Sequence, residues 1–369
     1  MRKIFIVIII ASLIVVGCSR DVENIKNNEI IENKTNIEKV VEEEIQVIES
    51  IEEKIEVVEE ESEDVQEIDL DKIRPNEIGK VMVVMYHSFG EEEKQFVSTP
   101  DIFREDLIVF NELGYVLVSL DDYVNNNMNI PAGKTPVVFT FDDGHSSNFR
   151  ILDEDAKIKI DPDSAVGIMD DFYSENNDFG REATFFLNGN VMFGQLEYID
   201  YKLNYLIDNG YDIGNHSYGH EDLSKLTKEG IQKTLGRNKE QIESYLDNYN
   251  VNTLALPFGK RPKDAELSKF VVNGRYNDKE YNNIGVLNVG WNPANSPISI
   301  NFNSNSINRV QAGSMDYQLD HWIDYFEKNP DRKYISDGDI NTITIPSVLK
   351  ESLNMEKLDN KELILYERK

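Results

Sequence analysis

The chain has 369 residues, a formal net charge of -30 at pH 7, 40% apolar residues and 10% aromatic residues. This length and apolar content are sufficient for one large α/β domain or two smaller domains. The acidic balance excludes nucleic acid as an expected partner, because proteins that bind phosphates present basic surfaces.

The N-terminus is typical of an export signal. Arg2 and Lys3 precede an apolar run from 4 to 16 that is short for a membrane span. The run ends in a small residue followed by Cys18, the only cysteine of the chain, as in bacterial lipoprotein signals. We predict that 1–18 is a lipoprotein signal peptide and that lipidated Cys18 anchors the protein outside the cytoplasm. An ordinary signal peptide or membrane anchor with an incidental cysteine is the alternative.

Residues 19–79 have a different composition. Glutamate dominates from 42 to 67, and proline is absent before Pro75. Apolar residues recur at helix-like intervals, but like charges four residues apart would weaken such a helix. We therefore predict an acidic tether, disordered or helical, between the membrane and the folded domain.

From residue 80 onward, strand-like and helix-like patterns alternate. Apolar runs predict strands at 81–85, 115–118, 136–139, 183–187, 213–215, 253–256, 285–289 and 343–345. Helical spacing predicts helices at 99–113, 121–127, 198–209, 228–249 and 262–273. This alternation is typical of an α/β domain with parallel strands, whose chemistry lies at the carboxyl ends of the strands.

The pattern also sets the expected limits of the domain. Residues 150–182 lack clear periodicity, so we expect an insertion at the rim of the site rather than an element of the core. The domain is expected to cover 80–349, with a C-terminal tail at 350–369.

Two adjacent carboxylates follow one predicted strand. Asp142 and Asp143 stand between a buried run and Gly144, where a strand ends and a loop begins. Neighbouring carboxylates repel each other if both are ionised and unpaired, and a cation on one would leave the other free to act as a base. A polar turn is the alternative for this pair alone.

Two histidines at a second predicted strand end fit the same chemistry. His216 and His220 are four residues apart and can face one ion across a tight turn. Two imidazoles and one carboxylate leave positions open on zinc for water and substrate, as in catalytic sites. Histidines exposed on the surface are the alternative.

Four segments in this order resemble the motifs of the polysaccharide deacetylases, the family that shares the NodB homology domain. They are Thr140 to Gly144, Ala183 to Phe186, His216 to His220 and Leu256 to Gly259, and the resemblance spans 80 to 345. It implies a distorted (β/α) barrel that removes acetyl groups from an N-acetylated polysaccharide with a divalent metal, most often zinc. We expect a monomer.

The resemblance also implies roles for individual residues. Asp143, His216 and His220 would bind the metal, and Asp142 would be the general base. The oxyanion of the reaction would be stabilised by the backbone N–H of Phe258, within Pro257-Phe258-Gly259, and Trp291 would line an apolar wall.

The sequence departs from the family pattern in two places. Ala255 stands where many members have an arginine that orients the base. The C-terminal histidine motif that supplies the general acid is missing, while His87 ends the first strand, which is similar to a circularly permuted branch that includes poly-N-acetylglucosamine deacetylases. We therefore predict His87 as the acid, with a structural core histidine as the alternative. His321 is the reserve candidate, and His145 is expected on the surface or beside the site.

The main hypothesis is a metal-dependent deacetylase of N-acetylglucosamine units in an extracellular or cell-wall glycan. Three alternatives stay open at this point: an esterase that removes O-acetyl groups from sugars, a surface lipoprotein that binds glycan without turnover, and a purely structural surface protein.

Overall fold

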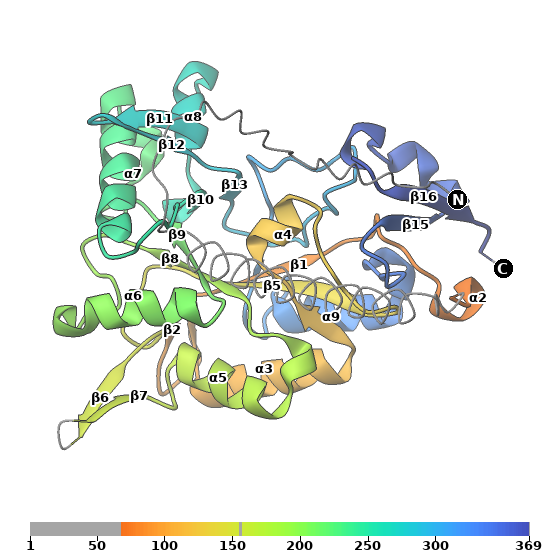
Figure 1. The fold of residues 1–369 in the computed structure, drawn as a ribbon, viewed down its shortest axis with the longest axis horizontal. Coiled ribbons are helices and arrows are strands. Elements are labelled where there is room, and N and C mark those ends of the chain that lie inside the picture. Colours follow the sequence, from red (N-terminus) through yellow and green to blue (C-terminus); the bar gives the residue numbers. More distant parts are fainter. Residues whose placement is uncertain (1–67, 155–156, 369) are drawn as a thin grey trace, which may run out of the picture. The chain divides into compact units, whose positions relative to one another are not determined.

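The protein was analysed as a computed structural model that describes residues 68–154 and 157–368 (Figure 1). The predicted signal peptide, Cys18 and the part of the tether before residue 68 lie outside the described residues. Within the described ranges, no helix combines the length and the apolar character needed to cross a membrane.

A sheet of eight parallel strands forms the centre of this unit. Seven of them follow the order β13-β10-β9-β8-β5-β1-β14, and β4 pairs with the first half of β5. Their bounds are β1 Met82–Tyr86, β4 Tyr115–Leu117, β5 Thr135–Phe141, β8 Ala183–Leu187, β9 Asp212–Asn215, β10 Thr253–Ala255, β13 Gly285–Leu287 and β14 Val310–Gln311. Every strand predicted between 80 and 300 is present in this sheet.

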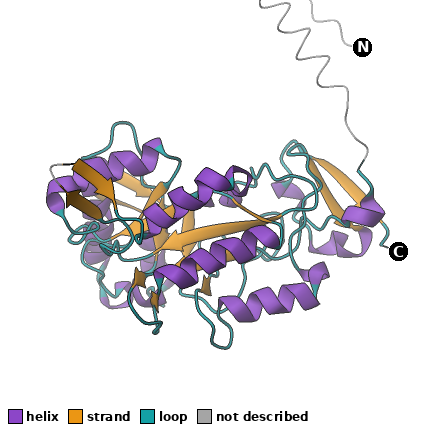
Figure 2. Cartoon of the chain, turned by 90° about the horizontal axis from the view of Figure 1, so that it is seen from below, coloured by secondary structure: helices purple, strands orange, loops and turns teal. Residues whose placement is uncertain are grey.

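Helices pack around the sheet, as the helices and strands of Figure 2 show. The described α-helices are α2 Leu70–Ile73, which lies near Tyr366 and Arg368 instead, α3 Pro100–Glu112, α4 Leu120–Val124, α5 Ala165–Glu175, α6 Ile199–Asp208, α7 Lys228–Glu243, α8 Ala265–Val272 and α9 Leu319–Lys328. The predicted cap of the first long helix is confirmed, since the Thr99 side chain accepts a hydrogen bond from the backbone N–H of Ile102. The predicted helix 228–249 is shorter and ends at residue 243.

Four smaller sheets of two strands complete the described part of the chain. They are β2 Ser88–Phe89 with β3 Val97–Ser98, β6 Ile151–Glu154 with β7 Lys157–Ile160, β11 Asn273–Tyr276 with β12 Lys279–Asn282, and β15 Thr342–Pro346 with β16 Glu362–Tyr366. The predicted strand 343–345 lies in the last of these, outside the central sheet.

The central sheet curls until its two edges share one segment. Ile307 bridges Leu287 of the edge strand β13, and three residues later Val310 pairs with Val84 of β1. The segment 307–311 therefore closes the curl in place of a full-length strand. This architecture confirms the predicted distorted (β/α) barrel.

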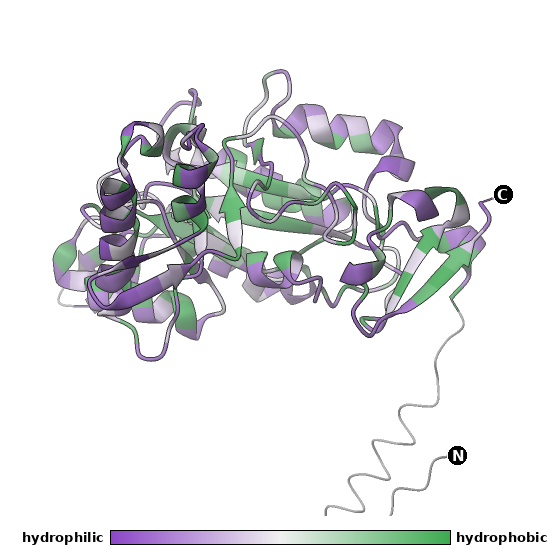
Figure 3. Cartoon of the chain, turned by 90° about the horizontal axis from the view of Figure 1, so that it is seen from above, coloured by the Kyte–Doolittle hydropathy of each residue, from purple (hydrophilic) through white to green (hydrophobic). Residues whose placement is uncertain are grey.

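Buried apolar residues cover both faces of the sheet, and Figure 3 shows how they gather on the central strands. Phe139 and Phe141 of β5 pack outward with α3 residues such as Phe103. Val138, which points to the other side, belongs to a separate cluster inside the curl. A strand buried on both faces requires the continuous apolar run that the sequence shows.

The prediction that 150–182 contains no element of the core is wrong for the helix α5. The segment contains the β6–β7 hairpin, whose strand β7 is largely exposed, and then α5, whose first five residues are buried, four of them in the main core. The apolar face of α5 is short, and the acidic residues around it, such as Asp170 and Asp171, conceal its periodicity in the sequence.

Two isoleucines of this segment allow a matched test of the correction. Ile168 in α5 is 2% exposed, whereas Ile158 in β7 is 50% exposed. We expect Ile168→Ala to lower the free energy of unfolding by about 2–5 kcal/mol, because it leaves a cavity in the core. Ile158→Ala should change it by roughly 0.5 kcal/mol or less. Urea denaturation checks both, and equal effects would contradict a core role for α5.

The folded unit extends beyond both expected boundaries, at 79 and at 350. It begins at Ile68, and the buried Glu77 carboxylate accepts hydrogen bonds from the backbone N–H of Thr344 and the hydroxyl of Tyr334. At the other end, β16 pairs with β15 along its whole length. Short segments of this kind give weak sequence signals, because their partners lie far away in the chain.

Candidate active site

The sheet register places Asp142 at the top of the barrel interior. Val138 and Thr140 of β5 face inward, and Asp142 continues the same alternation one step beyond the strand. The Thr140 hydroxyl donates to the Val84 carbonyl and accepts a hydrogen bond from Arg309. Hydrogen bonds therefore hold the end of β5 to its neighbour β1 and to the closing segment 307–311.

Arg309 holds Asp142 in a bidentate pair. Its Nη1 and Nη2 atoms each donate to one carboxylate oxygen of Asp142 at 2.7 Å, and the two side chains are 0% and 1% exposed. Burial acts to raise the pKa of Asp142, but the adjacent guanidinium outweighs it and holds the pKa below its usual value. Asp142 is therefore ionised at neutral pH.

Arg309 also takes the place of the arginine that is missing at Ala255. The arginine expected two residues before Pro257 is absent, and an arginine from the segment before β14 orients the predicted base instead. Sequence reasoning missed this residue because it stands in no motif. Its only signal is a single arginine enclosed by the apolar residues Ile307 and Val310.

Asp143, His216 and His220 converge on one point. Each offers one ligand atom, and these atoms all lie within 4.8 Å of one another. The Asp143 Oδ1 atom is 3.3 Å from the Nε2 atom of each histidine. Ligand atoms about 2.0–2.1 Å from a tetrahedral zinc ion lie roughly 3.3 Å apart. The spacing therefore fits a zinc-sized cation.

The tautomer of His216 supports the same conclusion. Its Nδ1 lies 2.9 Å from the Ala255 carbonyl oxygen, which can only accept, so the proton is on Nδ1. Its Nε2 then presents a lone pair toward a carboxylate oxygen of Asp143. Two electron-rich atoms that face each other in a buried site repel unless a proton or a metal cation lies between them, and a carbonyl partner on the far nitrogen is usual for metal-bound histidine.

Buried amides fix the loop that carries His216. The Asn188 side chain donates to the His216 carbonyl at 2.6 Å, and the Asn215 Oδ1 atom accepts from the Ser217 N–H at 2.9 Å. Asn238 from α7 donates to the same Oδ1 atom. The imidazole is thus held by contacts from β8, β9 and α7 together.

The backbone of the site is strained at several residues. Asp143, Ser217, His220 and Phe258 have φ values of 73°, 62°, 59° and 57°. Residues other than glycine adopt this conformation at a cost, and it persists where the surrounding structure imposes it. Its concentration around one point is typical of a functional site.

His145 lies beside the group formed by Asp143, His216 and His220. His145, expected on the surface or beside the site, donates from Nε2 to the Asp143 Oδ2 atom at 3.2 Å. Burial acts to raise the pKa of Asp143, but this hydrogen bond and the nearby imidazoles hold it far below its usual value. Asp143 is thus an anion directed at the two histidines.

His87 lies on the other side of Asp142. Its Nε2 atom is 3.9 Å from the Asp142 Oδ2 atom, and its ring packs against Phe96 at 4.6 Å. Among the described residues its buried Nδ1 atom has no hydrogen-bond partner. Burial lowers the pKa of His87 to about 4, so the imidazole is neutral at pH 7.

The remaining predicted residues lie around the metal group or the closing segment. Phe258, between the buried Pro257 and Gly259, places its ring 4.3 Å from the ring of His220. Trp291 bridges Val310 through its backbone, next to Arg309. His321, the reserve acid, packs against Tyr317 at the start of α9 and is not one of the grouped ligands.

We expect metal-free protein to bind one equivalent of Zn²⁺. Occupancy should raise the melting temperature, because an ion held at 100 times its Kd adds about 2.7 kcal/mol of stability. His216→Ala and His220→Ala should each weaken binding at least about tenfold, while His321→Ala should bind as the parent does. Calorimetric titration measures the stoichiometry, and unchanged affinity in the two ligand variants would contradict the site.

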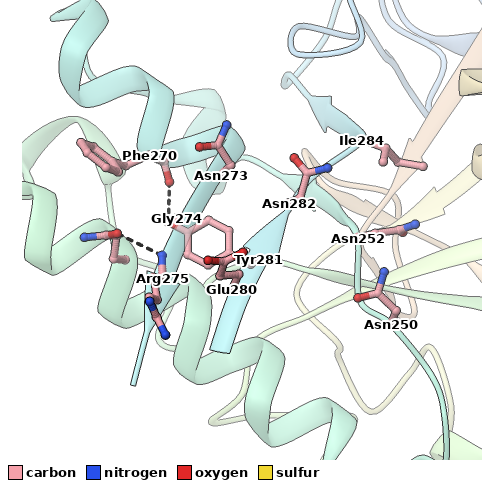
Figure 4. Close-up of a pocket in the computed structure, with 11 residues that line it drawn as sticks. Asn250, Asn252, Phe270, Asn273, Gly274, Arg275, Glu280, Tyr281, Asn282 and Ile284 are labelled. Atoms are coloured by element: carbon pink, nitrogen blue, oxygen red, sulfur yellow. Dashed lines mark hydrogen bonds between the residues drawn. The ribbon is translucent and has the colours of Figure 1, made fainter. Parts of the chain in front are cut away.

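A polar cavity of about 540 Å³ lies elsewhere in the unit (Figure 4). It is formed around the β11–β12 hairpin, and its lining includes Asn252 and Ile284, which precede β10 and β13. The grouped histidines follow the opposite, carboxyl end of the strands. This cavity therefore does not belong to the candidate site.

Comparison with known proteins gives a family for this arrangement. Residues 129–270 match the family model described as polysaccharide deacetylase. The deacetylase PplD of Streptococcus pyogenes, solved in complex with acetate, is similar in fold, with a TM-score of 0.50 and 17% identity over 66% of this chain and 97% of that chain.

Two curated relatives match over shorter stretches. The uncharacterized protein YlxY of Bacillus subtilis is 42% identical over 62 residues, and a chitin deacetylase of Arthroderma benhamiae is 25% identical over 154 residues. The matches cover 17% and 39% of this chain and only 18% and 35% of these relatives. None of the comparisons tests the permuted motif order. Residues 129–270, which include Asp142, Asp143, His216 and His220, are thus similar to the polysaccharide deacetylase family, and the described part of the chain shares the fold of a solved deacetylase.

Proposed function

We propose that the protein is a metal-dependent hydrolase that removes N-acetyl groups from N-acetylglucosamine units of an extracellular or cell-wall polysaccharide. The family match and the barrel support deacetylation as the reaction class. The observation that carries the proposal is that two neighbouring carboxylates face different partners. Asp143 faces the two histidines, while Asp142 is turned toward Arg309 and His87.

The residues fit a divalent cation, and zinc is proposed. Such an ion, when bound by Asp143, His216 and His220, would supply an acidified water and polarise the acetyl carbonyl. The task of the chain's own base is to accept the proton of the attacking water. Asp142 suits this task because it is ionised, because Arg309 fixes its orientation, and because its oxygens retain free lone pairs.

His87 is proposed to protonate the leaving amine. In the free protein it is neutral, so it must first gain a proton, and Asp142 is its nearest source at 3.9 Å. Asp142 has a lowered pKa and so releases the proton readily. The proton taken from water thus passes to His87 and then to the sugar nitrogen as the C–N bond breaks, leaving acetate and a free amine.

Phe258 and Trp291 are proposed to contact the acetyl group. The strained turn of Pro257-Phe258-Gly259 lies beside His220, and the Phe258 N–H would donate to the oxyanion. Trp291 would line the apolar side of the site.

Acetate release from zinc-loaded protein tests the function. We would measure it on β-1,6-linked and β-1,4-linked N-acetylglucosamine oligomers, on peptidoglycan and on an O-acetylated glycan. Release from an N-acetylated substrate supports the proposal. Faster release from the O-acetylated glycan would favour an esterase, and glycan binding without any release would favour a binding protein.

The predicted location forms a separate proposal. We propose that 1–18 directs export and that Cys18 carries the lipid, so that the domain acts outside the membrane. Metabolic labelling with a radioactive fatty acid should mark the full chain but not Cys18→Ala. Equal labelling of both chains would overturn this anchor.

A further inference from the structure

Three large aromatic side chains remain exposed around the candidate site. Phe258, Trp291 and Tyr317 are 56%, 50% and 55% exposed, in a unit that buries most of its aromatic residues. Exposed rings that gather in one region of a protein mark a binding surface more often than isolated ones do.

The topology places these rings on the edge of the sheet that carries the catalytic residues. Phe258 follows β10, Trp291 follows β13 and Tyr317 follows β14, each after the carboxyl end of a parallel strand. Asp142 and His216 follow β5 and β9 in the same way. All of these residues therefore lie along one rim of the barrel.

One side chain ties two of the rings together. The indole N–H of Trp322, in α9, donates to the backbone carbonyls of Trp291 at 3.0 Å and Tyr317 at 3.2 Å. The ring of Tyr317 packs at 5.0 Å from His321. Trp291 in turn bridges Val310, the neighbour of Arg309. Tyr317 is thus held in a fixed relation to the residue that orients the base.

The backbone under these rings is unfavourable for bulky residues. Tyr317 has a φ of 64° and Phe258 a φ of 57°, where glycine is the residue without strain. Neither burial nor backbone preference therefore explains a large aromatic residue at either position. We therefore attribute both aromatic residues to a role of the exposed ring.

We propose that the exposed Tyr317 ring, beside Trp291, forms a platform for the sugar unit next to the acetylated unit, so that kcat/KM rises with the length of the oligomer. This inference rests on the proposed function. Sugar rings present flat C–H faces that stack on aromatic rings, while their hydroxyl groups stay hydrated at the edges. An exposed tyrosine, with an apolar body and a polar tip, suits such a ligand.

The test compares the hexamer and the dimer of β-1,4-linked N-acetylglucosamine as substrates. Tyr317→Gly removes the ring and relieves the positive φ, so it should melt no lower than the parent protein. We expect the ratio of kcat/KM for hexamer over dimer to fall about tenfold in this variant and to be retained in Tyr317→Trp. Tyr201→Ala, which removes a 37% exposed ring from α6, is the matched control.

The outcomes separate this inference from the proposed function. An unchanged hexamer-to-dimer ratio in Tyr317→Gly, with the parent active, overturns the platform alone. If the parent releases no acetate from these oligomers or from the β-1,6-linked oligomers and peptidoglycan, the proposed function fails, and hexamer binding by calorimetry then decides. Binding about tenfold tighter in the parent than in Tyr317→Gly supports the platform, whereas equal affinities overturn it.

Discussion

Replacing Arg309 with methionine is expected to reduce acetate release at least about 100-fold and to destabilise the folded domain by about 3–5 kcal/mol. Both oxygens of Asp142 depend on this guanidinium, and both side chains are almost fully buried. The variant would leave a carboxylate buried without its partner, which is the most costly way to break such a pair. The rate and the free energy of urea unfolding are the two measurements.

The pH dependence of the same variant gives a sharper test. Asp142 has a lowered pKa in the folded parent, so its pairing stabilises the fold above its unfolded value of 3.8 and is lost only as the pH falls through the folded value. Without Arg309, burial dominates and raises the pKa, so the variant should become relatively more stable as the pH falls toward 5. The acid limb of its pH–rate profile should move to higher pH, because the base must be ionised.

Two further variants separate orientation from charge. Arg309→Lys keeps the charge but not the bidentate geometry, so it should recover most of the stability and only part of the rate. The double variant Arg309→Met with Asp142→Asn removes both charges. It should be more stable than either single variant and remain inactive. Full activity of Arg309→Met would show that the base needs no partner to orient it.

The barrel could be predicted from the sequence because its strands carry their own signal. Strands such as β5 and β8 are buried on both faces, so they require the continuous apolar runs seen at 136–139 and 183–187. The grouping of Asp143, His216 and His220 could also be predicted. Asp143 and His216 stand within two residues of the ends of β5 and β9, His220 lies in the turn after β9, and parallel strands end at the same edge.

The positions of Arg309, Tyr317 and α5 could not be predicted, because each depends on contacts that no local pattern in the sequence indicates. Arg309 is 167 residues from Asp142, and only the curl of the sheet brings the closing segment beside β1. Tyr317 is likewise placed by Trp322 and a strained turn. The apolar face of α5 is short and enclosed by acidic residues, so its periodicity was hidden. Pairings between distant short segments follow from the complete fold rather than from local pattern.

Replacing His87 with alanine is expected to slow removal of the N-acetyl group by roughly 10²–10⁴-fold and to spare a substrate with a good leaving group. An amine must be protonated as it departs, whereas p-nitrophenolate leaves from p-nitrophenyl acetate without a proton. The ester should therefore lose less than about tenfold in His87→Ala. Asp142→Asn should lose both reactions, because each begins with deprotonation of the attacking water.

The comparison of leaving groups also decides between the two candidate acids. His87 lies 3.9 Å from the base, whereas His321 contacts Tyr317 and Trp322 at the start of α9. If His321→Ala showed the selective loss on the amide and His87→Ala did not, the acid would come from α9. If His87→Ala slowed the amide and the ester equally, its role would be to position Asp142, because a residue that only orients the base affects every substrate alike.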